Sequence, residues 1–587
     1  MYIRTITFGN RTYRKSKSLS TFAFLKMQVM KKFKEFAVYC ENTGTEKKYP
    51  FGTTLSDIIE DQKIDIGEDI LGAMVNNTLK ELDYILYKPK TVNFIGYTHP
   101  DGQRMYTRSL SMVLFKAVVD LYPDYKLKIE HTVSKGLYCE LEGLTPDENH
   151  EKVVEKLHRR MQEIIEKDIP FEREEIRTEV ALRIFEEFGL EDKCTLMRTR
   201  KQFYSSVYKL DDVVNYFYGY LVPSTGYLKH FNLVKYYKGM LLVLPKKDHP
   251  DELEDIVIQN KLFDIFQEFK EWVEIIGVPN VGRLNEITLE GKIGDIIKIS
   301  EALQEKKVAC IADLIDKKET AKVVFISGPS SSGKTTFAKR LAVQLAVIGK
   351  KPVVISMDNY FVNRELTPLD ENGNYDFESP HALDIKLFNE NVLDLMEGKK
   401  IELPKFSFQE GKRYYDGTTL EMNDDGILIV EGIHGLNPEI SAMIPQERKF
   451  KVYVSALTPL SIDANNRIPT TDNRLIRRMV RDARYRGYSA LETLQRWPSV
   501  RKGEEKHIFP FQEEADVMFN TALLFELGVL KRWAEPLLRE VPPNEPEYSE
   551  AKRLLKFLSY LVNINAREIP PTSILREFLD GSSFHYS

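Results

Sequence analysis

Eight consecutive residues past the middle of the chain have the spacing of a phosphate-binding loop. From Gly328 to Thr335 they spell G-x-x-x-x-G-K-T, between the strand-like run KVVFIS and the helix-like run TTFAKRLAVQLAVIG. Glycines let the backbone wrap a phosphate closely, the lysine bridges the β and γ phosphates, and the threonine hydroxyl completes a Mg²⁺ shell. The pattern predicts a site for ATP or GTP with Mg²⁺. The expected contacts are Gly328, Ser330, Ser331, Ser332, Gly333, Lys334, Thr335 and Thr336.

Two carboxylates follow later strand-like runs. Asp358 ends VVISMD, and Glu431 lies at the end of ILIVEG. In an open α/β sheet the carboxyl ends of the strands face the ligand, so both acids are expected beside the phosphates. Asp358 could deprotonate an alcohol, and Glu431 could help Thr335 hold the metal. The alternative for each is a helix cap or a solvated acid.

Arginines are concentrated in the segment DNRLIRRMVRDARYRG. Arg474, Arg478 and Arg481 are spaced i, i+4 and i+7, so they share one face of a predicted helix, with Arg477 alongside. Such a face could close over the phosphates and offset charge during phosphoryl transfer. An ordinary solvated, charged helix is the alternative.

These residues need a parallel sheet to position them. From Ala321 onward, the short apolar runs KVVFIS, KPVVISMD, GILIVEG and KFKVYVSA alternate with helical patterns. Continuous apolar strands are typical of a parallel sheet covered by helices on both faces. We therefore predict an α/β fold for this part of the chain.

Composition limits the remaining possibilities. A chain of 587 residues is too long for one ordinary core, and several domains are expected. With 83 Lys and Arg against 88 Asp and Glu, the net charge of −5 provides no global basic field for nucleic acid. The four cysteines form no CxxC pair, which fits a reducing cytoplasm. No apolar run is long enough to span a bilayer, so no membrane contact is expected.

The motifs of the C-terminal half resemble one family. GPSSSGKTT, SMDNYF, YDFESPHALD, ELPKFSFQEGKR, ILIVEGIHGL and RRMVRDARYRG occur in the order typical of the uridine kinase and phosphoribulokinase group of P-loop kinases. The resemblance implies that Asp358 accepts the proton of a ribose 5′-hydroxyl. It also implies catalytic roles for Lys334, Arg478 and Arg481. The acceptor-binding positions implied with Asp358 are Tyr360, Phe377, Glu378, Phe406 and Arg486.

One departure from that family leaves the acceptor open. Uridine-cytidine kinases carry a tyrosine, an aspartate and a base-reading histidine where this chain has Phe406, Ser407 and Gly411. Ring stacking can survive these changes, but the hydrogen bond to the base edge cannot. Uridine or cytidine is the leading acceptor, and another nucleoside or a sugar phosphate is the alternative. A further hypothesis is a nucleotide-switched, RNA- or tRNA-associated regulatory protein.

The N-terminal half resembles a different family. YPFGTTLSDII and GAMVNNTLKELDY are similar to a TGS domain, and RSLSMVLFKAVVDLYP with VPSTGYLKHFNLVKYYKG resembles the editing domain of threonyl-tRNA synthetases. The functional positions of that editing domain correspond here to Arg108, Met112, Phe217 and Leu221. None of the four is a His or Cys, so we predict no aminoacyl-tRNA hydrolysis. RNA docking, small-molecule sensing and homo-oligomer formation are the uses left open for this half.

Together these patterns predict a multidomain chain. Its segments are an N-terminal extension (1–32), a β-grasp-like TGS domain (33–98), an α+β editing-like domain (99–250), a helical connector (251–318), the P-loop kinase domain (319–540) and a C-terminal helical segment (541–587).

Overall fold

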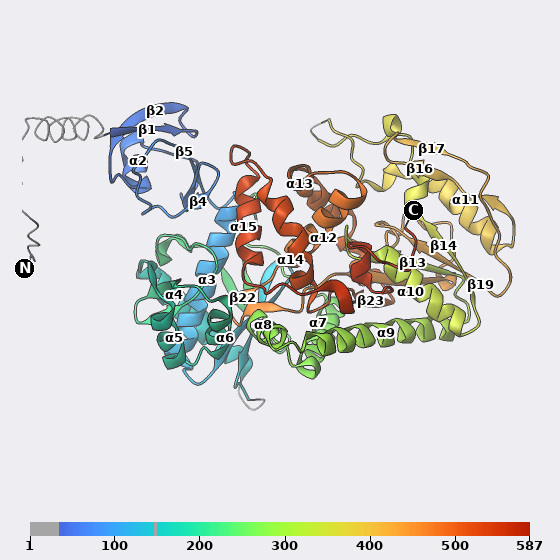
Figure 1. The fold of residues 1–587 in the computed structure, drawn as a ribbon, viewed down its shortest axis with the longest axis horizontal. Helices are drawn as coiled ribbons and strands as arrows, with labels where there is room; N and C mark the ends of the chain where they lie inside the picture. The colour runs from blue at the N-terminus through green and yellow to red at the C-terminus, as the bar shows by residue number, and fades with distance from the viewer. Residues whose placement is uncertain (1–34, 146–148, 372, 587) are drawn as a thin grey trace, which may run out of the picture. The chain divides into compact units, whose positions relative to one another are not determined.

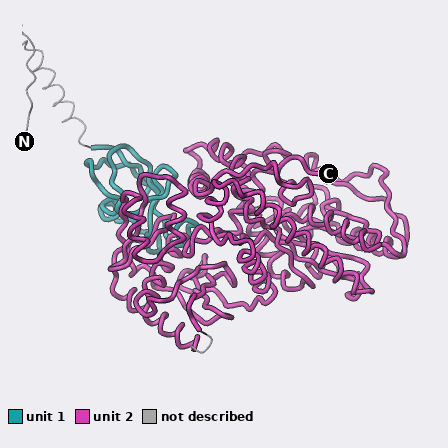
Figure 2. The backbone as a smooth tube through the Cα atoms, turned by 60° about the horizontal axis from the view of Figure 1, so that its bottom comes forward, with its two compact units in different colours: residues 1–102 teal, residues 103–587 magenta. Residues whose placement is uncertain are grey.

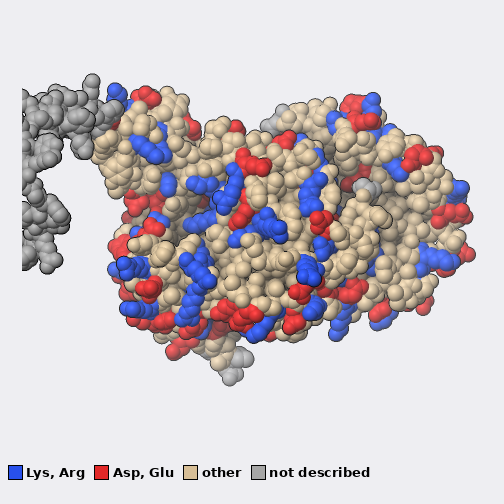
Figure 3. Space-filling view, in the orientation of Figure 1, with Lys and Arg blue, Asp and Glu red and all other residues tan. Residues whose placement is uncertain are grey.

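The computed structural model describes residues 35–145, 149–371 and 373–586. The predicted extension 1–32 lies outside these residues. The described chain forms two compact units, which divide between Gly102 and Gln103 (Figure 2). No helix among the described residues is long and apolar enough to cross a membrane. On the face drawn in Figure 3, basic and acidic side chains are interspersed, as the near-balanced composition predicts.

The first unit is a small mixed sheet with one helix. Its strand order is β2-β1-β5-β3-β4, and β1 pairs parallel with β5. The strands are β1 (Glu35–Cys40), β2 (Thr45–Pro50), β3 (Gly72–Val75), β4 (Leu79–Lys80) and β5 (Lys90–Ile95), and the helix is α2 (Leu55–Gln62). Thr54 caps α2 through a capping box with Asp57. This arrangement is the predicted β-grasp-like domain.

The second unit begins with two antiparallel sheets and four helices. One sheet has the order β11-β12-β7-β6 and the other β10-β9-β8. The strands are β6 (Lys126–Val133), β7 (Gly136–Glu142), β8 (Glu172–Arg177), β9 (Tyr204–Leu210), β10 (Val213–Asn215), β11 (Asn232–Tyr236) and β12 (Gly239–Val243). The helices are α3 (Pro100–Leu121), α4 (His150–Glu166), α5 (Thr178–Glu187) and α6 (Glu191–Arg200). This arrangement is the predicted α+β domain.

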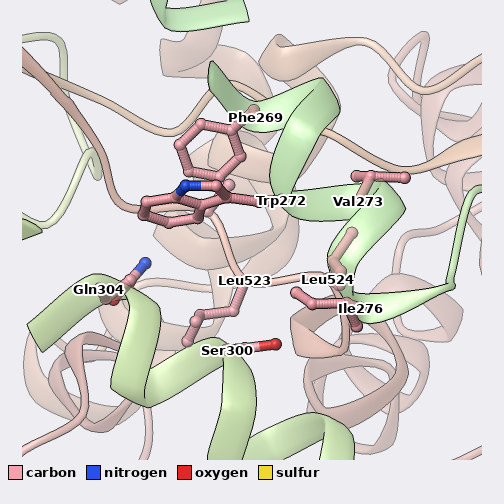
Figure 4. Close-up of a pocket in the computed structure, with 9 residues that line it drawn as sticks. Phe269, Trp272, Val273, Ile276, Ser300, Gln304, Leu523 and Leu524 are labelled. Carbon is pink, nitrogen blue, oxygen red and sulfur yellow. The ribbon is translucent and has the colours of Figure 1, made fainter. Parts of the chain in front are cut away.

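Three helices link this domain to the parallel sheet: α7 (Asn260–Ile276), α8 (Val281–Leu289) and α9 (Ile293–Lys317). A small cavity lies where Trp272 of α7 and Gln304 of α9 meet Leu523 (Figure 4). Within the described chain, the buried Oγ of Ser300 and Nε2 of Gln304 have no hydrogen-bond partner. The cavity has room for about one water molecule but not for a nucleoside.

The C-terminal half of the second unit is built on a five-stranded parallel sheet with the order β14-β19-β13-β20-β23. The strands are β13 (Val323–Ser327), β14 (Lys351–Ser356), β19 (Gly426–Glu431), β20 (Lys449–Ser455) and β23 (Val517–Asn520). Val324 and Ile326 pack on one face with α10 (Lys334–Val347), while Val323 and Phe325 pack on the other with α11 (Ile385–Met396). The predicted parallel sheet covered on both faces is confirmed.

The strand order places the site. From β13 the chain passes over β19 to β14, and from β19 it passes over β13 to β20, so the direction of winding reverses around β13. Ligands in such sheets bind beyond the carboxyl ends of the strands at this reversal. The phosphate-binding loop, Asp358 and Glu431 all stand at those ends.

Further elements complete this half of the second unit. The longer helices are α12 (Thr470–Tyr485), α13 (Ala490–His507), α14 (Glu526–Arg539) and α15 (Tyr548–Leu558), and β16 (Lys405–Ser407) pairs with β17 (Lys412–Tyr414). The chain after α15 was expected to be helical. It instead forms short 3₁₀ turns, one of them Ile574–Glu577, and returns to the phosphate-binding loop (Figure 1).

Candidate active site

The loop between β13 and α10 has the backbone geometry of an anion cradle. Ser331 and Gly333 adopt positive φ, at 57° and 84°. A Cβ on Gly328 would lie 1.8 Å from the carbonyl oxygen of Val454, so only glycine fits there. The first amides of α10 have no acceptor within the helix, and such amides are suited to bind anions.

The hydroxyls and the ammonium of the loop fit a bound phosphate chain. Within the described residues, the buried Oγ atoms of Ser331 and Ser332 lack a hydrogen-bond partner. Lys334 Nζ donates to the carbonyl of Pro329 at 3.1 Å, and burial lowers its pKa. Lys334 and Thr335 keep partial exposure, while Ser331, Ser332 and Gly333 are buried. A buried cradle with unpaired donors is what phosphates require.

The two predicted carboxylates stand side by side. Burial raises the pKa of Asp358, opposed by the charges of Lys334, Arg486 and Arg481. Burial, and then the neighbouring charge of Asp358, raises the pKa of Glu431 to about 7. Ser356 donates from Oγ to Glu431 at 2.9 Å. Asp358 is thus close to three cations, and the pKa of Glu431 depends on the charge of Asp358. This arrangement is what a base beside a metal-binding acid would require.

The first part of the arginine helix α12 is structural. Arg474 pairs with Glu504, with Nη2 and Oε2 2.7 Å apart, and it donates to the carbonyl of Ser330 at 3.0 Å. Arg477 pairs with Glu526 and donates to the carbonyl of Thr521 at 3.1 Å. Because both guanidiniums are buried in ion pairs, the expectation that Arg474 shares a free lid face with Arg478 and Arg481 is wrong. These two arginines brace the loop instead.

The second part of α12 carries the accessible cations. Arg478, Arg481 and Arg486 all contact the carboxylate of Asp482, at 3.2, 2.9 and 3.5 Å. Arg478 also donates to Ser330 Oγ at 2.8 Å. The charge of Arg481, followed by burial, lowers the pKa of Arg486 to about 10. Three cations on one carboxylate leave an excess of positive charge beside the loop and Asp358, where a transferring phosphoryl group needs it.

The predicted acceptor-binding residues differ in their exposure and in their contacts. Phe377 is 41% exposed, and burial followed by the charge of Glu504 raises the pKa of Glu378 to about 7. Phe406 packs with the rings of Phe361 and Phe408. Tyr360 is fully buried in the core, where its hydroxyl accepts from Asn391 at 3.2 Å. Tyr360 thus supports the turn that carries Asp358 rather than offering a free side chain.

The side chain of Arg364 occupies the space beside Gly411. A Cβ on Gly411 would lie 2.7 Å from Nε of Arg364, and the amide of Arg364 donates to the Gly411 carbonyl at 2.8 Å. The guanidinium of Arg364 also donates to the Phe408 carbonyl at 2.9 Å. The position where the family reads a base therefore has a cation beside it.

The C-terminal half is similar to known proteins. Residues 323–523 match the model of the "Phosphoribulokinase / Uridine kinase family". This segment belongs to that family. A uridine kinase from Staphylococcus aureus strain JH9 is 28% identical over 197 residues, which are 33% of this chain and 86% of that protein. A solved structure of a possible uridine kinase from Bacillus stearothermophilus, 20% identical, covers 34% of this chain and 89% of that chain with a TM-score of 0.22.

The N-terminal part is similar to threonine–tRNA ligases. A threonine–tRNA ligase from Acetivibrio thermocellus is 29% identical over 201 residues, which are 33% of this chain and 31% of that ligase. The chain spans about a third of the length of the ligases it matches. A synthetase-like N-terminal part is thus fused to a P-loop kinase domain.

The four positions that match the editing residues carry side chains that are buried or in contact with other residues. Arg108 of α3 donates to the carbonyl of Tyr220 at 3.4 Å, and its guanidinium lies 4.9 Å from the ring centre of Tyr218. Met112, Phe217 and Leu221 are buried. Arg108 and the segment 217–221 therefore fill this region with side chains, which favours a scaffold; the absence of hydrolysis stays a prediction.

The kinase domain is tied to the synthetase-like part by a hairpin of β21 (Ser461–Asp463) and β22 (Asn466–Arg467). Asp463 accepts from Lys193 Nζ at 2.6 Å, and both side chains are fully buried. Asn466 donates to the carbonyl of Tyr216 at 2.9 Å. Helix α12 begins only three residues after this hairpin, so the arginine helix is anchored in the synthetase-like part.

A second set of ion pairs joins the same helix to α3. Arg553 pairs with Asp472 of α12 at 2.7 Å and with Glu550 at 2.6 Å. Arg104 of α3 also pairs with Glu550 at 2.9 Å, and both arginines help to lower the pKa of Glu550 to about 2 against the effect of its burial. The start of α12 is therefore held from both sides by residues outside the kinase family segment.

Several site residues were missed by sequence reasoning. Glu504 accepts from the amide of Ser330 at 3.0 Å, although 174 positions separate the two. Glu577 and Tyr586, near the end of the chain, contact Thr336. No local pattern marks these contacts, because each depends on the tertiary fold. Asp482 did carry a signal, since it follows Arg478 at i+4.

Proposed function

We propose that the chain transfers the γ-phosphoryl group of ATP or GTP to the 5′-hydroxyl of a nucleoside, with uridine or cytidine as the leading acceptor. The observation that supports this most is Asp358. Its carboxylate follows β14, beside the lysine of the loop and the cations Arg481 and Arg486. A protein that only hydrolyses a nucleotide as a switch has no need of an acceptor base at this position.

The chemistry follows from these positions. Asp358 accepts the proton of the alcohol while the alcohol oxygen attacks the γ-phosphorus and the bond to the β-phosphate oxygen breaks, releasing ADP or GDP. Lys334, Arg478 and Arg481 offset the charge on the transferred group. Thr335 and Glu431 would hold Mg²⁺, which supplies charge neutralisation to the β and γ phosphates. Arg486 would hold the acceptor side of the site.

A sugar phosphate is the second candidate acceptor, and Arg364 is the observation that favours it. A guanidinium donates hydrogen bonds and accepts none, and it matches phosphate geometry. The guanidinium of Arg364 lies beside Gly411, where it would suit an anion or a carbonyl oxygen at the far end of the acceptor. Glu378 and Phe377 would contact the sugar in either case.

A panel of nucleosides and sugar phosphates, assayed for ADP release with the full-length protein, tests this proposal. Uridine or cytidine should support turnover, and Asp358→Asn should abolish it without loss of nucleotide binding. Asp394→Asn, which changes an exposed acid paired with Lys399, is the matched control and should leave turnover unchanged. Turnover with ribulose 5-phosphate and none with any nucleoside would reverse the order of the two candidates.

A further inference from the structure

The described C-terminal segment reaches into the phosphate-binding loop. Glu577 Oε2 accepts from the Thr336 hydroxyl at 2.7 Å and from the Thr336 amide at 3.3 Å. The hydroxyls of Tyr586 and Thr336 lie 2.9 Å apart, and since the Thr336 hydroxyl donates to Glu577, the Tyr586 hydroxyl donates to Thr336. Glu577 and Tyr586, both near the end of the chain, thus contact Thr336, the third residue of α10.

These contacts use groups that a nucleotide needs. Thr336 is among the first residues of α10, whose amides have no partner inside the helix. Loops of this type cradle the α and β phosphates with such amides. A carboxylate satisfies the amide and the positive end of the helix in the same way as a phosphate oxygen. The negative charge of Glu577 is also felt by Lys334 and Glu431.

We propose that Glu577 is a built-in competitor of the nucleotide, holding the Thr336 amide and hydroxyl until a phosphate displaces its side chain. The proposal rests on the nucleotide site of the proposed function but not on the identity of the acceptor. Two anions cannot share one amide without repulsion, so the carboxylate must turn away when a phosphate binds. Glu577 therefore lowers the affinity of the site for nucleotides.

The backbone around Glu577 is held in place by buried neighbours, so the Glu577 carboxylate stays close to the phosphate-binding loop. Ile574, Leu575 and Phe578 are fully buried. Ile574 packs on Gly333, where a Cβ would lie 2.7 Å from its Cγ2, and Phe578 lies beneath the guanidinium of Arg477, 5.0 Å from its ring centre. Only the side chain has to move, which keeps the carboxylate at a high local concentration near the amide.

Equilibrium binding of ATP, ADP and adenosine to the full-length protein tests this proposal without any acceptor. Glu577→Gln keeps the shape and an acceptor oxygen but removes the charge, and it should tighten ATP and ADP binding about tenfold. Adenosine, which has no phosphate, should bind equally to both proteins. Asp580→Asn is the matched control, because Asp580 lies in the same segment as Glu577 but pairs with Arg484 of α12, and it should change nothing.

The outcomes separate this proposal from the proposed function. If Glu577→Gln binds ATP and ADP as the unchanged protein does, or more weakly, Glu577 is not a competitor, although the kinase proposal stands. If the unchanged protein binds no nucleotide at all, the proposed function fails first. A gain in affinity cannot come from misfolding, and a matching thermal midpoint for Glu577→Gln and Asp580→Asn confirms that both variants fold. Tyr586→Phe, which removes the neutral hydrogen bonds to Thr336 and Ser582, should shift affinity by less than Glu577→Gln.

Discussion

Replacing Asp463 by Asn tests whether the synthetase-like part is an integral support of the kinase domain. Asp463 and Lys193 form an ion pair with both side chains fully buried. Asn removes the negative charge and leaves the ammonium of Lys193 buried without its counter-ion. Removing one partner of a buried pair costs about 3–5 kcal/mol, far more than the roughly 0–1 kcal/mol of a surface pair. The hairpin keeps its other bonds, for example from Asn466 to Tyr216, so we expect a loss of about 3 kcal/mol.

Urea denaturation of the full-length protein, followed by circular dichroism and by nucleotide binding, measures this effect. Asp463→Asn should lower the midpoint for both probes, because the hairpin leads into the arginine helix. The double variant Asp463→Asn/Lys193→Met should recover much of the loss, since it leaves no unpaired charge. Asp394→Asn, in an exposed pair, is the control for charge loss alone. An unchanged midpoint for Asp463→Asn, or a double variant no more stable than the single, would refute the reasoning.

Three further predictions follow from the site. Gly328→Ala should abolish ATP binding in a calorimetric titration, because its Cβ would lie 1.8 Å from the Val454 carbonyl oxygen; tight binding by the variant would contradict the geometry of the loop. The rate of ADP release should rise with pH through about pH 7, because burial and the charge of Asp358 raise the pKa of Glu431 to about 7 and this acid holds a metal only when deprotonated. Burial also raises the pKa of Asp358, and a base works only when deprotonated, so a rate that falls over this range would contradict the roles of both acids. Arg364→Met should raise KM for the acceptor about tenfold or more with kcat nearly unchanged, and an unaltered KM would remove Arg364 from the acceptor site.

The parts of the fold that follow local rules could be predicted from the sequence. The strands that end just before Gly328, just before Asp358 and at Glu431 showed as apolar runs. These features depend on near neighbours in the chain, so the pattern alone contains them.

The contacts between distant segments could not be predicted. Helical spacing grouped Arg474 with Arg478, but it does not show that Glu504 neutralises Arg474 in the interior. The turn carrying Asp358 was expected to present Tyr360 to the acceptor, whereas packing against Phe388 buries that ring. The approach of Glu577 to Thr336 spans 241 positions and depends on the path of the whole C-terminal segment.

The most direct test of the account is single-turnover phosphoryl transfer by Asp358→Asn, with ATP affinity measured on the same preparation. The account predicts that product formation from the accepted alcohol falls at least about a hundredfold while the dissociation constant for ATP changes little. Product formation at the rate of the unchanged protein would contradict the assignment of Asp358 as the base that activates the acceptor.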